Sequence, residues 1–275
     1  MKNHGSKQTR ITSGITVVFD ASEQDTAELI ADTVDKVLYL IQEKWGLNRP
    51  QDCRIYIMTF WWDFFFRSAP WPWKVMLVIA LPLWSLRAQR VWPYSAAWTQ
   101  RYGRRVAIGI KPPWLLEVSD KSIGVHMYVE EKDTNTKVRH VTCHELTHAC
   151  SAHLKLPAWL NEGIAQVTVD CFLEKRTIRT DTLELVRSFT PRGRPPTYRE
   201  LSRMGGQTLA YHAVRGYWLV RFLEDQCPGL LKRKLISYRE SRKIEDALAV
   251  EMELEPDSLW SQIDDRLVAH FQAME

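Results

Sequence analysis

The segment that most constrains the fold is VTCHELTHAC, at residues 141–150, because its pattern requires a helix. The chain of 275 residues has eight histidines, and two of them, His144 and His148, are four residues apart. On a helix, such side chains lie on one face about a turn apart, so both imidazoles can point at a common position. Apolar residues at 138, 141, 146 and 149 supply packing positions. The pattern predicts a partly buried helix over about residues 137–153.

Two imidazoles placed in this way are a common beginning of a tetrahedral zinc site. Glu145 directly follows His144, so its carboxylate can lie beside the metal without binding it. There it can accept a proton from water whose pKa the metal has lowered to about 7. An HExxH arises by chance in roughly one to two such chains per hundred, so the pattern alone is insufficient. The apolar setting strengthens it, because burying a polar pair without a partner is costly.

The next segment, LPAWLNEGIAQ at residues 156–166, offers a third ligand. Pro157 suits the first turn of a helix after a break at 155–156, which predicts a chain reversal and a second helix over about 157–172. Glu162 then falls in the second turn, where it can lie opposite the two imidazoles. We therefore expect His144, His148 and Glu162 to bind one Zn²⁺ with an open fourth position. The alternative for Glu162 is a solvated glutamate on a surface helix.

HELTH followed by PAWLNEGIAQ resembles the gluzincin metallopeptidases, the thermolysin-like and aminopeptidase-N-like clan. The resemblance runs from His144 to Gln166. It implies that His144, His148 and Glu162 are the zinc ligands and that Glu145 is the general base and proton shuttle. It also implies a thermolysin-like catalytic core.

The sequence departs from these families at three points. Thirteen residues separate His148 from Glu162, fewer than in thermolysin, so the chain is more similar to the compact bacterial peptidase-MA-like domains. Gln166 stands where thermolysin-like members have an aspartate that supports a zinc histidine, and Asp170 lies one turn further on. An amide raises the basicity of a ligand less than a carboxylate does. No GxMEN-like segment is present, so exopeptidase activity is not supported.

Amide hydrolysis also needs a donor that stabilises the oxyanion. The predicted helix at 207–225 resembles the AYxxxxxxxxYL helix that follows the zinc motif in peptidase-MA-like proteins, and Tyr211 matches its tyrosine. The resemblance thus implies a catalytic role for Tyr211, with His212 as a less favoured substitute. The alternative is that Tyr211 packs in a core helix.

The remaining pattern predicts an α+β fold. Residues 1 to about 13 are expected to form a loose tail, residues 14–153 an N-terminal part with a small sheet and the active-site helix, and residues 154–275 a mainly helical subdomain. The predicted strands are 15–20, 54–60, 106–110 and 124–130, and the other predicted helices are 25–45, 228–239 and 256–272.

Residues 61–105 interrupt this order. They hold seven of the twelve tryptophans and seven basic residues, with Asp63 as the single acid. The uncharged run at 75–86 is shorter than the roughly 20 residues that a spanning helix needs, and Pro82 is expected to interrupt it. Tryptophan and arginine around a short apolar run favour a membrane-surface segment. A lid or partner-binding surface and a plain core segment remain alternatives.

The net charge of +4 is too small to suggest nucleic-acid binding, and five cysteines without a CxxC pair argue against a disulfide framework. No apolar stretch follows the basic N-terminal residues, so no secretory signal is expected. These features favour a cytoplasmic protein, with peripheral attachment at the inner membrane face through 61–105 as an option.

Together the patterns predict a zinc-dependent metallopeptidase, an endopeptidase acting on a peptide or protein substrate. Two alternatives belong to other classes. The first is a membrane-associated binding protein whose metallopeptidase-like domain is inactive, which the glutamine at position 166 motivates. The second is a structural zinc protein, which is disfavoured because Glu145 would have no role.

Overall fold

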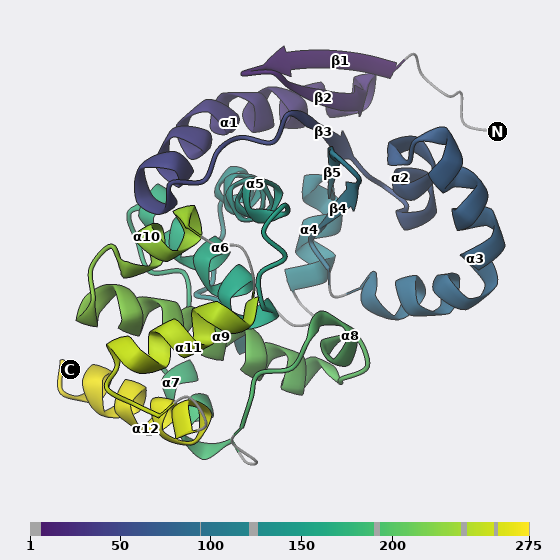
Figure 1. Cartoon of the computed structure of the whole chain (residues 1–275). Helices are drawn as coiled ribbons and strands as arrows, with labels where there is room; N and C mark the ends of the chain where they lie inside the picture. The colour runs from purple at the N-terminus through teal and green to yellow at the C-terminus, as the bar shows by residue number, and fades with distance from the viewer. Residues whose placement is uncertain are drawn as a thin grey trace. The chain divides into compact units, whose positions relative to one another are not determined.

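The computed structural model describes residues 7–93, 95–120, 126–189, 193–237, 241–255 and 258–274 (Figure 1). The protein is α+β, as predicted, with one mixed five-stranded sheet and a majority of helix. Its contacts divide it into two compact units. Unit 1 comprises Met1–Leu40, Asn48–Val125 and Glu130–Cys150, and unit 2 comprises Ile41–Leu47, His126–Val129 and Ser151–Glu275.

Unit 1 contains the sheet, in the order β1-β2-β3-β5-β4. The strands are β1 (Lys7–Thr12), β2 (Ile15–Asp20), β3 (Asp52–Ile57), β4 (Ala97–Tyr102) and β5 (Arg105–Ile110). β2, β3 and β5 pair in parallel, whereas β1 and β4 pair antiparallel with their neighbours. Three of the four predicted strands are thereby confirmed. The fourth, at 124–130, lies partly outside the described residues, and the described part forms an isolated bridge from Tyr128 to Ile178.

The prediction of a loose N-terminal tail is wrong for Lys7–Thr12, because these residues form β1. Ser13 and Gly14 have φ angles of 43° and 74°, and this tight turn folds β1 back onto β2. Residues 1–6 lie outside the described residues. β1 was missed because KQTRIT has little apolar content, and its partner strand, not its own hydrophobicity, stabilises it.

The tryptophan-rich segment, residues 61–105, consists largely of regular secondary structure. It forms α2 (Trp61–Ser68), α3 (Trp71–Val91) and the unpredicted strand β4. Phe64 and Phe65 of α2 pack in a core cluster with Tyr56 and Met58, so the core interpretation holds for α2. The expectation that Pro82 would interrupt the apolar run is wrong, because α3 continues through it. Among the described residues, no helix combines the length and apolar character needed to cross a membrane.

The other helices of unit 1 follow the prediction closely where one was made. α1 (Gln24–Trp45) begins one residue before the predicted helix and continues into unit 2. It buries Ile30, Val34 and Val37. α4 (Pro113–Asp120) was not predicted, and α5 (Thr134–Ser151) matches the predicted active-site helix to within three residues.

Unit 2 is helical. Its elements are α6 (Ala158–Leu173), α7 (Thr182–Ser188), α8 (Tyr198–Leu201), α9 (Gly206–Gln226), α10 (Leu230–Ile236), α11 (Ser241–Glu251) and α12 (Leu259–Gln272). α6 and α9 cross at two glycines. A Cβ on Gly163 would lie 2.3 Å from the carbonyl oxygen of Gly216, and one on Gly216 would lie 2.5 Å from the carbonyl oxygen of Trp159. Gly163, which directly follows Glu162, therefore permits the close contact between α6 and α9 that positions α6.

Candidate metal centre

α5 positions the two motif histidines as the sequence predicted. Val138 and Leu146 are fully buried, and α5 up to Cys150 belongs to unit 1. The Nε2 atoms of His144 and His148 lie 3.0 Å apart, and the two rings are nearly perpendicular at 89°. Two nitrogens at zinc-ligand distance in a tetrahedral site are separated by about 3.3 Å. The observed spacing is close to that value, so the pair can bind one cation.

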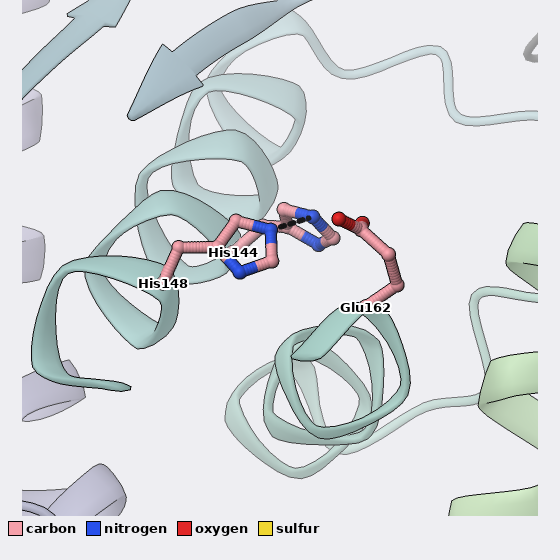
Figure 2. A group of neighbouring side chains, drawn as sticks. All are labelled: His144, His148 and Glu162. Atoms are coloured by element: carbon pink, nitrogen blue, oxygen red, sulfur yellow. Dashed lines mark hydrogen bonds between the residues drawn. The ribbon is translucent and has the colours of Figure 1, made fainter. Parts of the chain in front are cut away.

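Glu162 completes a three-residue group. Figure 2 shows its carboxylate pointing toward the two imidazoles, His144 and His148 coming from α5 and Glu162 from α6. The ligand atoms of the three side chains all lie within 4.8 Å of one another. Two imidazoles and one carboxylate are a donor set that zinc accepts. The three residues that the sequence predicted as ligands thus come together in a group that could hold one metal ion.

Glu145 directly follows His144 on α5 and does not belong to the three-residue group. Its side chain is 8% exposed, and its Oε2 accepts a hydrogen bond of 2.7 Å from the hydroxyl of Thr99. Thr99 belongs to β4, which lies at the end of the described sheet. The hydroxyl also lies 3.3 Å from the backbone carbonyl of Glu145. Thr99 therefore fixes the orientation of the carboxylate, and sequence reasoning missed it because β4 was not predicted.

Tyr198, on α8, is the second residue that sequence reasoning missed. Its hydroxyl donates a hydrogen bond of 2.8 Å to Oε1 of Glu162 and accepts one of 2.6 Å from Nδ2 of Asn161. Oδ1 of Asn161 in turn accepts from the hydroxyl of Ser151 at 2.7 Å. This chain of contacts holds the carboxylate of Glu162 by way of α8.

A capping box fixes the position of Tyr198. The Thr197 side chain accepts from the backbone N–H of Glu200, and the Glu200 carboxylate accepts from the backbone N–H of Thr197. Thr-x-x-Glu is readable in the sequence as a helix start. However, no local signal links residue 198 to residue 162, so the contact was not predictable.

We expect Tyr198→Phe to weaken zinc binding about tenfold, since losing a hydrogen bond to a ligand costs about 10–100-fold in metal affinity. Competition against a chromophoric chelator measures this. Tyr39→Phe is the matched control, because Tyr39 is 69% exposed on α1. Equal affinities for both variants would show that Tyr198 does not support the ligand.

A cavity of about 430 Å³ opens beside Tyr198. Leu156 and Ala152 contribute apolar surface, and the charged side chains on its wall are Lys155 and Arg199. Lys155 has a φ of 52°, a left-handed conformation that is uncommon for a residue with a side chain. The full lining is Ser151, Ala152, Lys155, Leu156, Asn161, Thr197, Tyr198 and Arg199.

Tyr211 lies in α9 in a buried aromatic group. It is 1% exposed, and its ring stacks on Phe189 with centroids 3.7 Å apart. His212 packs edge-on at 4.7 Å. Burial, together with the charge of Arg215, lowers the pKa of His212 to about 4, so its ring is neutral at pH 7. These contacts match a packed core residue, and the predicted oxyanion role of Tyr211 stays a prediction.

Gln166 and Asp170 belong to a buried polar network in unit 2. Nε2 of Gln166 donates to the hydroxyl of Thr177 at 2.6 Å, and that hydroxyl donates to Asp170 at 2.6 Å. The hydroxyl of Tyr217 also donates to Asp170, at 2.7 Å. Burial raises the pKa of Tyr217, which keeps the donor neutral. Asp170 therefore anchors Thr177 and Tyr217 to α6.

The two cysteines that flank the motif pack in the core. Cys143 is 0% exposed and Cys150 is 1% exposed. Burial raises the pKa of Cys150 to about 12, so it remains a thiol at neutral pH. Buried free cysteines of this kind commonly behave as small hydrophobic residues, and the metal-binding group found in the described residues contains neither of them.

Comparison with known proteins adds no further constraint on this site. The sequence matches no protein-family model, and no curated protein matches it at a significant level.

Proposed function

We propose that the protein is a zinc-dependent metallopeptidase with a gluzincin-like, compact peptidase-MA-like catalytic core. The observation that carries the proposal is the convergence of His144, His148 and Glu162 within 4.8 Å. Glu145 lies on the same helix as the two histidines, outside the ligand group and held by Thr99. A structural zinc site needs four protein ligands and no adjacent base. The group of three ligand-type side chains among the described residues, with Glu145 on the same helix as two of them, supports a catalytic site instead.

Zinc, when bound, would polarise the scissile carbonyl and lower the pKa of the attacking water. The chain would supply the proton transfers. Glu145 would accept a proton from the water and deliver it to the leaving amine. Thr99 would keep the carboxylate in position, because its hydroxyl already binds Oε2 at 2.7 Å.

The proposed substrate is a peptide or protein in extended conformation. β4 pairs with β5 on one side and ends the described sheet on the other. An extended peptide can add to such an edge through main-chain hydrogen bonds. Because Thr99 of β4 contacts Glu145, a peptide on this edge would run next to the general base. Binding along a strand, together with a sequence that has no GxMEN-like segment, supports endopeptidase action.

The direct test is to incubate the zinc-loaded full chain with a mixture of peptides of diverse sequence and to identify products by mass spectrometry. We expect internal cleavage, its loss after treatment with a chelator, and its return after adding one equivalent of Zn²⁺. Cleavage that persists in excess chelator would overturn the zinc mechanism.

One alternative has an observation in its favour. A membrane-associated binding protein with an inactive metallopeptidase-like domain would also bind zinc, and Gln166 in place of a carboxylate motivates it. That protein would hold one zinc per chain and leave the whole peptide mixture intact. The same experiment therefore separates the two functions.

A further inference from the structure

α3 presents a row of large apolar side chains to solvent. The exposed fractions are 77% for Trp71, 47% for Val75, 58% for Val78, 71% for Ile79 and 61% for Leu86. Because a helix turns by about 100° per residue, these five positions fall within an arc of roughly 100°. Met76, which is 60% exposed, lies about 60° beyond Ile79, and Trp73, which is 46% exposed, lies further round, so exposed apolar surface on α3 also extends beyond this arc. The five positions form one stripe along the helix, defined here as the α3 stripe. Contiguous apolar surface of this kind marks an interaction site on a folded protein.

The opposite side of α3 is already occupied. Leu77 packs against the core cluster that includes Tyr56 and Phe65, and Ala88 is buried. By the same rotation, Leu77 lies about 150° and Ala88 about 130° from the middle of the α3 stripe. The ring of Trp73 also contacts Tyr102 of β4, with centroids 5.7 Å apart. The helix is therefore packed along the line of Leu77 and Ala88, and the α3 stripe lies apart from these two contacts.

The end of α3 is also fixed. Lys111 is 2% exposed and donates hydrogen bonds to the carbonyl of Trp92, at 2.6 Å, and to the hydroxyl of Ser119, at 2.8 Å. Its ammonium lies 4.2 Å from the centre of the Trp92 ring. A buried cation committed to the residue that follows α3 holds the helix on unit 1. Figure 1 shows α3 as the long blue helix between α2 and β4.

The charged residues of α3 are all basic. The sequence has no acidic residue between Phe64 and Leu116 and has eight basic residues there, of which Lys111 is buried and Arg67 and Arg105 form ion pairs with acidic residues outside this range. Lys74 and Arg90 lie on α3 near its two ends, and neither forms an ion pair with any residue that the structure describes. Asp63, just before this region, is paired with Arg67 at 2.7 Å. A partner surface that binds the α3 stripe is therefore expected to carry negative charge.

We propose that the α3 stripe docks on the surface of an anionic phospholipid bilayer, with the helix axis in the plane of the interface. Exposed apolar side chains would enter the acyl boundary, Trp71 would sit at headgroup depth, and Lys74 and Arg90 would meet phosphates.

The proposal is tested by sedimenting the full chain with vesicles of equal parts phosphatidylcholine and phosphatidylglycerol. We expect binding that falls about tenfold or more in pure phosphatidylcholine. We expect a similar loss in the double variant Val75→Glu/Ile79→Glu, which places two charges in the α3 stripe. The matched control is Ile11→Glu/Val250→Glu, because these residues are 74% and 70% exposed, lie outside α3 and give the same change in charge.

Each outcome decides the question. Retained binding of the control together with loss for the stripe variant supports the proposal, provided that both have the wild-type circular dichroism spectrum. Equal loss in both variants, or no binding of the wild type to the anionic vesicles, overturns it. Conversion of an oligomer to a monomer by Val75→Glu/Ile79→Glu, without vesicle binding by the wild type, would show that the stripe binds a second copy of the chain. None of these readouts depends on peptide hydrolysis.

Discussion

Replacing Glu145 with glutamine is expected to lower peptide hydrolysis about 10³-fold or more while leaving one zinc per chain in place. Glutamine preserves the size of the side chain but cannot accept the proton. Glu145 is not among the three residues whose ligand atoms converge, so the metal should remain. The turnover number and the zinc content of the same preparation, measured together, test both halves of this expectation.

The matched control for this experiment is Glu43→Gln, because Glu43 is an exposed glutamate on α1. It should keep both activity and metal. Loss of zinc from Glu145→Gln would mean that Glu145 acts as a ligand rather than as a base. Unchanged turnover would remove Glu145 from the mechanism and favour a different proton acceptor.

Helices with strong local signals were predictable. α1 begins one residue from its predicted start and ends at the predicted residue because an apolar period of 3.6 runs through it and Gly46, with a φ of 69°, stops it. β1 and β4 were not predictable, since KQTRIT and AWTQRY have weak patterns of their own. Their stability comes from pairing with β2 and β5, which is a tertiary effect that overrides local propensity.

The residues of the candidate site also differ in whether the local sequence predicts their position. His144, Glu145 and His148 are set by one helix, so the spacing of residues along α5 was enough to predict their arrangement. Glu162 needed only the next helix and the Pro157 start. The residues that hold these groups come from further away in the sequence. Thr99 precedes Glu145 by 46 residues and Tyr198 follows Glu162 by 36, and such contacts leave no local pattern.

Removal of a ligand gives the second large effect. We expect His148→Ala to weaken zinc binding by about 10³-fold or more, and Glu162→Gln by about 10²-fold, since loss of a direct ligand should exceed the 10–100-fold typical of its supporting partners. Alanine leaves two protein ligands, whereas glutamine keeps a neutral oxygen in place of the carboxylate. Zinc content after dialysis and competition against a chelator give the two affinities.

The order of these effects tests the geometry. His153→Ala is the matched histidine control, because His153 is exposed just beyond the end of α5. It should bind zinc as the wild type does. Tyr198→Phe, which loses only a hydrogen bond to Glu162, should fall between this control and Glu162→Gln. Zinc affinity in Glu162→Gln equal to that of the wild type would exclude Glu162 from the site, and the two histidines alone would then be too few ligands for a catalytic zinc.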